Sequence, residues 1–295
     1  MRLVETPLLQ IACEESGPAG GAPLLLLHGW PDDARGYDRV LPALHAAGFR
    51  TFAPFLRGFG ATRFRSPQTP RSGQMAAMAQ DAIDLADALG LPRFSVVGHD
   101  WGARISYVLA AAFPDRVERC ATMAVGWQPG PLPTPSLEGA RAFWYQWFFA
   151  TARGAEALGR DGRAFARFLW DTWSPPGWID EAAFAATAAS FDNPDWAAIT
   201  VHAYRVRWEE AAPDPAYAAL EERYRRVTRI GVPTLLLQGG DDRCVLPAST
   251  EGRERYFTGG YARNVLDGVG HFPLREAPDA VAALLVPFLR GEARR

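Results

Sequence analysis

The sequence contains no lysine, carries almost no net charge and lacks any long uninterrupted apolar run. All 31 basic residues are therefore arginines, and the net charge of −2 gives no general electrostatic reason to expect nucleic acid or an anionic membrane as a partner. No segment approaches the roughly 18 consecutive apolar residues of a membrane-spanning helix. The composition therefore argues against a nucleic-acid-binding protein and against a membrane-spanning one.

Cysteine is also scarce. Cys13, Cys120 and Cys244 lie far apart and form no C-x-x-C pair, which argues against a disulfide framework or a zinc site and is typical of reduced thiols. The first ten residues include Glu5 and Pro7, where a signal peptide needs an apolar stretch. We therefore expect a soluble cytoplasmic protein, long enough at 295 residues for one large domain or for a core with an insertion.

Short apolar runs alternate with helical patterns along most of the chain. The predicted strands are residues 23–27, 50–56, 94–97, 118–125, 233–238 and 264–266. The predicted helices are residues 36–47, 75–89, 101–113 and 278–289. This alternation predicts a mostly parallel sheet that helices cover on both faces.

The alternation stops over residues 127–228, which contain no convincing strand. This stretch begins with a proline-rich turn, QPGPLPTPS, and is dense in Trp, Phe, Tyr, Ala and Arg. We expect it to form a helical insertion of the α/β core, placed as a lid.

The run VVGHDWGAR at residues 96–104 has the outline of a nucleophile elbow with Asp100 in the place of serine. Such a strand-to-helix turn is tight and needs small residues two positions before and two after the nucleophile, which Gly98 and Gly102 provide. The predicted strand ending at residue 97 and the predicted helix from residue 101 supply the required context. The alternative interpretation is an ordinary turn aspartate that caps the helix.

A nucleophile in this position needs a base and a group that orients the base. His271 is the only histidine after the helical insertion and directly follows the last predicted strand. The acid is expected after the strand at 233–238, where Asp241 and Asp242 stand in GGDD; we prefer Asp242 for its G-x-x-D spacing. The alternatives are a structural histidine and a loop-capping aspartate.

Charge that develops on a carbonyl oxygen needs backbone donors already in place. The amide of Trp101, directly after the nucleophile, is one expected donor. The loop after the strand at 23–27 reads HGWP, so the amide of Trp30 is the second, and a cis bond before Pro31 would fix this turn. HGWP as a simple turn is the alternative.

These motifs together resemble the α/β-hydrolase fold superfamily and, within it, the epoxide hydrolases. The matching stretches are HGWP at 28–31, LRGFGAT at 56–62, GHDWG at 98–102, PDRV at 114–117, GGDD at 239–242 and GHFP at 270–273. The resemblance implies a core of residues 1–126 and 229–295, with residues 127–228 as a helical cap inserted after the sixth core strand. An aspartate nucleophile narrows the resemblance to hydrolases that form an alkyl-enzyme ester: epoxide hydrolases, haloalkane dehalogenases and fluoroacetate dehalogenases.

In epoxide hydrolases two cap tyrosines bind and protonate the epoxide oxygen. Tyr145 in FWYQWFF and Tyr204 in HAYRVRW match those two positions, and Phe149, one helical turn after Tyr145, matches a phenylalanine of the first motif. The resemblance thus implies that the tyrosines act on the substrate and that Phe149, Trp30 and Trp101 line its site. Ordinary aromatic packing is the alternative for each tyrosine.

We therefore expect an epoxide hydrolase that forms an ester on Asp100, with His271 and Asp242 activating the water that releases a diol. The expected substrate is an apolar or aromatic epoxide, with no metal or organic cofactor and with a monomeric or homodimeric protein. A haloalkane dehalogenase is the main alternative, because the indole N–H groups of Trp30 and Trp101 suit a halide. A non-catalytic ligand receptor and an ordinary esterase are further alternatives, the latter weakened because no serine stands at the elbow.

Overall fold

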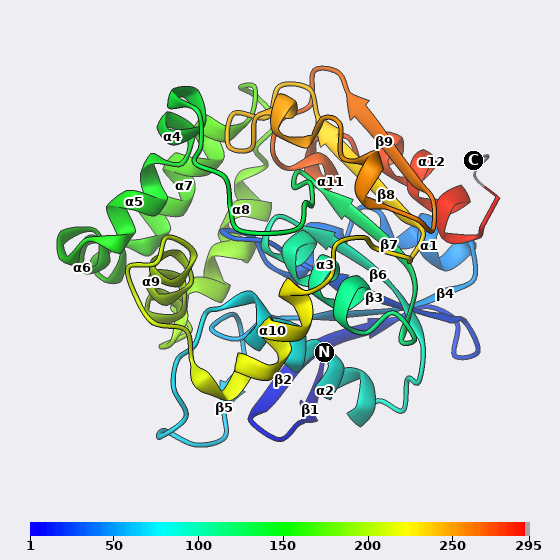
Figure 1. Cartoon of the computed structure of the whole chain (residues 1–295), viewed down its shortest axis with the longest axis horizontal. Coiled ribbons are helices and arrows are strands. Elements are labelled where there is room, and N and C mark those ends of the chain that lie inside the picture. The colour runs from blue at the N-terminus through cyan, green and yellow to red at the C-terminus, as the bar shows by residue number, and fades with distance from the viewer. Residues whose placement is uncertain (293–295) are drawn as a thin grey trace.

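The computed structural model describes residues 1–292, and its strands form one nine-stranded sheet (Figure 1). The strands are β1 (Arg2–Glu5), β2 (Leu9–Ser16), β3 (Ala22–Leu27), β4 (Phe49–Pro54), β5 (Arg63–Phe64), β6 (Phe94–His99), β7 (Val117–Met123), β8 (Thr234–Gly239) and β9 (Tyr261–Leu266). Their order is β1-β2-β4-β3-β6-β7-β8-β9, with β5 paired to β2. All pairings from β4 to β9 are parallel, whereas β1, β2 and β5 pair antiparallel.

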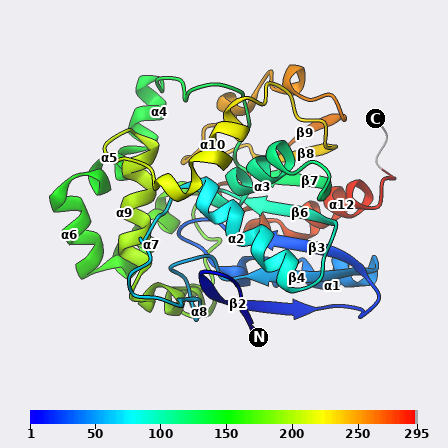
Figure 2. The same ribbon diagram turned by 60° about the horizontal axis from the view of Figure 1, so that its bottom comes forward.

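Helices cover both faces of the sheet. The helices of the core are α1 (Leu41–Ala46), α2 (Met75–Ala88), α3 (Trp101–Ala112), α11 (Pro273–Glu276) and α12 (Pro278–Leu289), with short 3-10 turns η1 (Ala34–Tyr37), η4 (Pro247–Thr250) and η5 (Glu254–Tyr256). In Figure 2, α2 and α3 lie over one face, whereas α1 packs against β4 and α12 on the other side. Covered faces explain why β3 is a continuous run of leucines, all of them buried.

Between β7 and β8 every regular element of the described chain is a helix or a 3-10 turn. The elements are α4 (Leu137–Ala142), α5 (Trp144–Ala150), α6 (Ala152–Arg160), α7 (Gly162–Trp173), α8 (Glu181–Ala188), η2 (Ala189–Asp192), α9 (Trp196–Arg207), η3 (Pro215–Tyr217) and α10 (Ala218–Arg225). In Figure 1, α4 to α9 lie together to one side of the sheet, whereas α10 returns to the core and packs on α3. Residues 137–225 are called the helical segment below.

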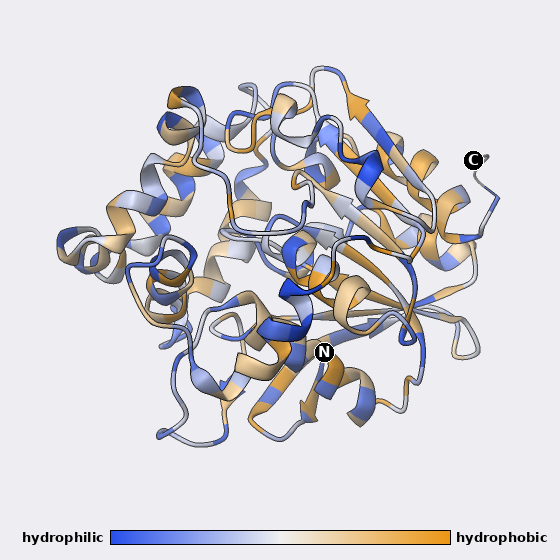
Figure 3. Ribbon diagram, viewed as in Figure 1, coloured by the Kyte–Doolittle hydropathy of each residue, from blue (hydrophilic) through white to orange (hydrophobic). Residues whose placement is uncertain are grey.

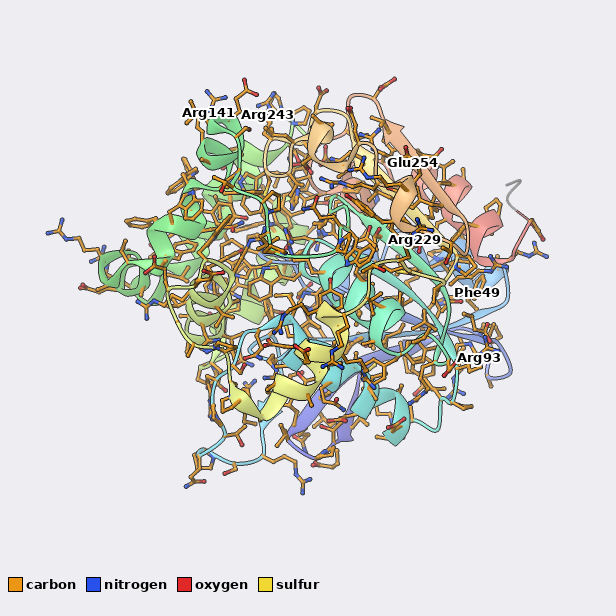
Figure 4. All side chains as sticks on the ribbon, viewed as in Figure 1. Phe49, Arg93, Arg141, Arg229, Arg243 and Glu254 are labelled. Atoms are coloured by element: carbon orange, nitrogen blue, oxygen red, sulfur yellow. The ribbon has the colours of Figure 1, made fainter. Side chains whose placement is uncertain are left out.

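Apolar residues are concentrated in the strands of the sheet and on the helix sides that face it (Figure 3). One continuous core cluster runs from the sheet into the helical segment. Most charged residues lie outside, as Figure 4 shows for Arg93, Arg141, Arg229, Arg243 and Glu254, all of them exposed. No helix within residues 1–292 is long and apolar enough to cross a membrane.

The predicted α/β-hydrolase fold with a mostly parallel sheet is confirmed, although several boundaries were wrong. The strand predicted to reach residue 56 ends at Pro54, and the strand predicted from residue 264 begins at Tyr261. The helix predicted over 36–47 is two pieces, η1 and α1, because Tyr37 turns inward to donate its hydroxyl hydrogen to the Leu27 carbonyl. Strands β1, β2 and β5 were not predicted.

Candidate active site

Asp100 stands at a strained turn between β6 and α3. Its φ of 50° and ψ of −108° are unusual for any residue with a side chain, and such strain persists only where the surroundings enforce it. A Cβ on Gly98 would lie 2.1 Å from the carbonyl oxygen of Gly102, and a Cβ on Gly102 would lie 1.8 Å from that of Leu27. The two glycines are therefore required by the close approach of backbone on both sides of the elbow.

The carboxylate of Asp100 is buried against the loop that follows β3. Oδ1 accepts a hydrogen bond from the amide of Trp30 at 3.0 Å. A Cβ on Gly29 would lie 2.5 Å from the Cβ of Asp100, so only glycine allows this approach. The Trp30–Pro31 bond is cis. Of the two expected oxyanion donors, the Trp30 amide thus lies at Asp100, and Trp101 is the first residue of α3, directly after Asp100.

His271 lies between two carboxylates. Its Nδ1 is 2.9 Å from Oδ2 of Asp242, and its Nε2 is 3.8 Å from Oδ2 of Asp100. Asp242 is buried, whereas its neighbour Asp241 is exposed, so the structure brings Asp242 and not Asp241 to the histidine. Burial by itself lowers the pKa of His271, but the charge of Asp242 and its hydrogen bond outweigh this effect, and the net pKa is raised.

The Asp242 carboxylate is held by the turn that follows β8. Oδ1 accepts the backbone N–H groups of Cys244 and Val245, each at 2.8 Å. Oδ2, the oxygen that faces His271, also lies 3.4 Å from Nε2 of Gln238. Because its own oxygens are fixed, Asp242 fixes the imidazole ring and keeps the Nδ1 hydrogen on the side away from Asp100.

The loop that carries His271 is fixed by a network that sequence reasoning missed. Glu276 accepts the amides of Gly270 and Phe272 at 2.6 and 2.8 Å, and the hydroxyl of Ser174 donates to it at 2.7 Å. Ser174 in turn accepts the amide of His271 at 2.9 Å. The helical segment therefore contacts the loop of His271 directly through Ser174. The only signal in the sequence is the position of Glu276 a few residues after His271, which by itself points to no role.

The two predicted tyrosines lie together above the nucleophile loop. The rings of Tyr145, on α5, and Tyr204, on α9, are 5.4 Å apart and perpendicular. Both pack on the indole of Trp30, at 5.7 and 5.6 Å, and Phe149 also lies 5.7 Å from that indole. Burial raises the pKa of both hydroxyls well above 10, so each remains a hydrogen-bond donor at neutral pH.

A glutamine next to Tyr145 fixes the orientation of its hydroxyl. The side-chain oxygen of Gln146 accepts Nε of Arg207 at 3.1 Å and the indole N–H of Trp208 at 3.0 Å. The amide nitrogen must then point the other way, and it donates to the Tyr145 hydroxyl at 2.7 Å. Because this bond occupies a lone pair of the tyrosine oxygen, its hydrogen is free to point elsewhere; the nearby Sγ of Cys244 is 3.6 Å away. Sequence reasoning missed this role for Gln146.

A cavity of about 500 Å³ lies beside Asp100 and the two tyrosines. Asp100, Trp101, Tyr145 and Tyr204 line its wall, together with residues of α3, α10 and the loop after β7. Trp30 and Phe149, two of the predicted substrate contacts, do not line this cavity. Both pack against Tyr145 and Tyr204. His271 and Asp242 are likewise buried behind Asp100. Within residues 1–292, no three His, Cys, Asp or Glu side chains are grouped in a way that could hold a metal ion.

Comparison with known proteins gives matches along nearly the whole chain. The family model described as alpha/beta hydrolase fold matches residues 22–278. Epoxide hydrolase A of Mycobacterium tuberculosis is 27% identical over 98% of this chain and 97% of that protein. A solved structure from Klebsiella pneumoniae, described as a candidate epoxide hydrolase, is 38% identical over 98% of this chain and 97% of its own, with a TM-score of 0.92. Epoxide Hydrolase A from Mycobacterium thermoresistibile is 25% identical over 100% of this chain and 99% of its own, with a TM-score of 0.79.

Proposed function

The chain belongs to the alpha/beta hydrolase fold family, and on that premise we propose that it hydrolyses epoxides to vicinal diols through an ester on Asp100. The relatives over its full length that are described as epoxide hydrolases support this activity. The single observation that carries the proposal is one cavity wall that holds both the elbow aspartate and the two buried tyrosines. A carboxylate nucleophile and two acidic O–H donors are the groups that opening of an epoxide requires.

In the first step Asp100 attacks an epoxide carbon while Tyr145 and Tyr204 donate hydrogen bonds to the ring oxygen. The new C–O bond forms as the carbon–oxygen bond of the ring breaks, and the leaving alkoxide takes a proton from a tyrosine. An aspartate suits attack at sp³ carbon, because the resulting ester retains a carbonyl that water can attack later. A serine would form an ether, which water cannot release.

In the second step His271 removes a proton from a water molecule that attacks the ester carbonyl of Asp100. Asp242 stabilises the imidazolium that forms and keeps the ring in its orientation, as the 2.9 Å contact supports. The backbone amides of Trp30 and Trp101 stabilise the oxyanion. Collapse of the tetrahedral intermediate restores the carboxylate and releases the diol, and the proton on His271 returns to the tyrosine oxygen through solvent.

The helical segment supplies both tyrosines and contacts the loop of His271 through Ser174. We therefore propose that residues 127–228 act as a cap over a core of residues 1–126 and 229–295. The cap shields the ester from bulk water and positions the two acids, whereas the core holds the nucleophile and the base. In this division α10, although inside the cap range, packs with the core helix α3.

One observation favours a haloalkane dehalogenase as the second candidate. Within residues 1–292 the buried indole nitrogen of Trp30 has no hydrogen-bond partner, and an indole N–H can bind a leaving halide, although this indole does not line the cavity. The same aspartate, histidine and second aspartate would serve that reaction. Two buried tyrosine hydroxyls are not needed for a halide, which is why epoxides remain the first choice.

One assay tests the choice of leaving atom. The purified protein is incubated with styrene oxide, a trans-disubstituted epoxide and a bromoalkane, and diol and bromide are both quantified. We expect diol from at least one epoxide and no bromide above the level of the Asp100→Ala variant. Bromide release without diol would replace the proposal by the dehalogenase alternative, and tight binding without any turnover would favour a receptor.

A further inference from the structure

We propose that the cavity binds an epoxide that also carries a carboxylate, with Arg104 and Arg207 binding that anionic group while Asp100 attacks the ring. This proposal rests on the proposed epoxide chemistry and adds a substrate class to it. It changes the expectation of a purely apolar substrate into that of an amphipathic acid.

Arg104 lies on α3 one helical turn after Asp100, and both residues line the cavity. Within residues 1–292 its guanidinium has neither a hydrogen-bond acceptor nor an ion-pair partner. Its side chain is half-buried in the cavity wall. The N–H donors of its guanidinium are therefore available to an anion in the cavity.

Arg207 ends α9 and approaches the same cavity from the helical segment. Its Nε is bound to Gln146, and the cation lies 5.9 Å from the ring of Phe143 and 5.1 Å from that of Trp208, without a carboxylate partner in the described chain. Burial and the charge of nearby Arg104 lower the pKa of Arg207 to about 9, so the side chain still carries its charge at pH 7. Two cations that face one cavity without an anion are stabilised by a ligand that brings one.

Some other arginines of this protein form ion pairs with carboxylates. Buried Arg57 pairs with Asp81 at 2.6 Å, and Arg225, at the rim of the same cavity, pairs with Glu222. Exposed arginines such as Arg141 and Arg229 also lack an ion-pair partner, but Arg104 and Arg207 differ from them because both line the same cavity as Asp100.

The cavity wall carries two glutamates that do not neutralise Arg104 and Arg207. Glu221 accepts the side-chain amide of Gln74 at 2.7 Å, and Glu209 is exposed to solvent. Neither forms an ion pair with Arg104 or Arg207. The remaining acid on the wall, Asp100, is the proposed nucleophile, and it loses its negative charge when the ester forms.

Asp100 and Arg104 stand one helical turn apart at the start of α3 and both line the cavity, so one small ligand can reach both residues. The apolar side chains of Val108, Val125 and Trp127 line the same cavity. They suit a flat hydrocarbon or aromatic spacer between the epoxide and the acid.

The test compares two matched probes, 4-(oxiran-2-yl)benzoate and the neutral 4-(oxiran-2-yl)benzamide. We expect kcat/KM for the acid to exceed that for the amide by about tenfold or more, mainly through KM, because a charge-assisted hydrogen bond to a guanidinium is stronger than a neutral one. Arg104→Met should bring this ratio to about one, and Arg104→Lys should restore part of it. The matched control Arg225→Met, at the rim and already ion-paired, should keep the wild-type ratio.

A binding measurement separates this proposal from the epoxide chemistry on which it rests. Calorimetry with 4-ethylbenzoate and 4-ethylbenzamide requires no turnover. Tighter binding of the acid that is lost in Arg104→Met supports the anion site even if neither epoxide is opened, in which case only the proposed reaction fails. Equal binding of the two probes, or a preference for the acid that survives Arg104→Met and Arg207→Met, overturns the anion site. A loss of both acid and amide turnover in Arg104→Met with an unchanged ratio also overturns it, because the arginine would then serve only Asp100.

Discussion

Nε2 of His271 lies 3.8 Å from Oδ2 of Asp100, on the side of the imidazole opposite the bond to Asp242. This separation is too long for a hydrogen bond, so the histidine does not hold the nucleophile. The same geometry places the proposed base beside the carboxyl group of the proposed ester. The two steps of the proposed reaction therefore depend on different residues, which separate variants can reveal.

Replacing His271 by glutamine should stop the second step and leave the first intact. We expect one equivalent of epoxide to remain on the protein as an ester, visible in intact mass spectra as an adduct of the epoxide mass on the peptide containing Asp100. The double variant that also carries Asp100→Ala is the control and should show no adduct. An adduct of equal yield in that control would place the covalent bond elsewhere.

Replacing Asp242 by asparagine should lower kcat by about a hundredfold or more, because the imidazolium loses its stabilising charge. The pH dependence should also move. Water activation needs neutral His271, and Asp242 raises the pKa of that histidine, so the wild-type rate should fall as the pH falls through this raised value. Without Asp242 the pKa drops, and the acid limb of the kcat profile should move to lower pH. An acid limb that stays in place would assign it to another group.

The tyrosine pair should control ring opening. Replacing both Tyr145 and Tyr204 by phenylalanine should reduce epoxide turnover by about a thousandfold or more, since the leaving alkoxide loses both proton donors. Each single variant should lose less, because the other hydroxyl remains. Ester formation measured in the His271→Gln background shows directly whether the first step is affected. A double variant that forms ester at the wild-type rate would remove the tyrosines from the mechanism.

The elbow should tolerate no side chain at Gly102. A Cβ there would lie 1.8 Å from the carbonyl oxygen of Leu27, so Gly102→Ala should cost about 3 kcal/mol or more of the free energy of unfolding. Gly159, on α6, is the matched control, since nothing lies within 4 Å of its added Cβ. Gly159→Ala should be neutral or stabilising by up to about 1 kcal/mol. Urea unfolding of both variants measures the difference, and equal midpoints would contradict the strained elbow.

The sequence was sufficient to predict the parallel core because its strands are short apolar runs between recognisable helices. The run PLLLL indicated a buried strand, and the glycines around Asp100, between a predicted strand and a predicted helix, indicated the elbow. Strands β1 and β2 escaped prediction because their pairing is antiparallel and decided by contact with β4, far along the chain. The split of the helix predicted over 36–47 depends on a tertiary contact of Tyr37, which no local pattern contains.

Asp100, Asp242, His271 and Trp30 were predicted from chain order and motif spacing, which place residues after the strands of one sheet edge, whereas Tyr145, Tyr204 and Phe149 were implied by the resemblance to epoxide hydrolases. Supporting residues such as Gln146, Ser174 and Glu276 could not be found in this way. Their roles depend on hydrogen bonds between side chains and loops far apart in the sequence, as in the 2.9 Å bond from the His271 amide to Ser174. The unmatched charges of Arg104 and Arg207 are likewise visible only once α3 and α9 face one cavity.

A single turnover in water enriched in heavy oxygen tests the ester on Asp100 most directly. With enzyme in excess over styrene oxide, water attacks the ester carbonyl, so the heavy atom should enter the carboxylate of Asp100 and not the first diol formed. Mass spectrometry of the peptide around residue 100 and of the diol measures both. Label in Asp100 with unlabelled diol is the predicted result. Label that arrives in the diol during that single turnover, with Asp100 unlabelled, would contradict the covalent mechanism.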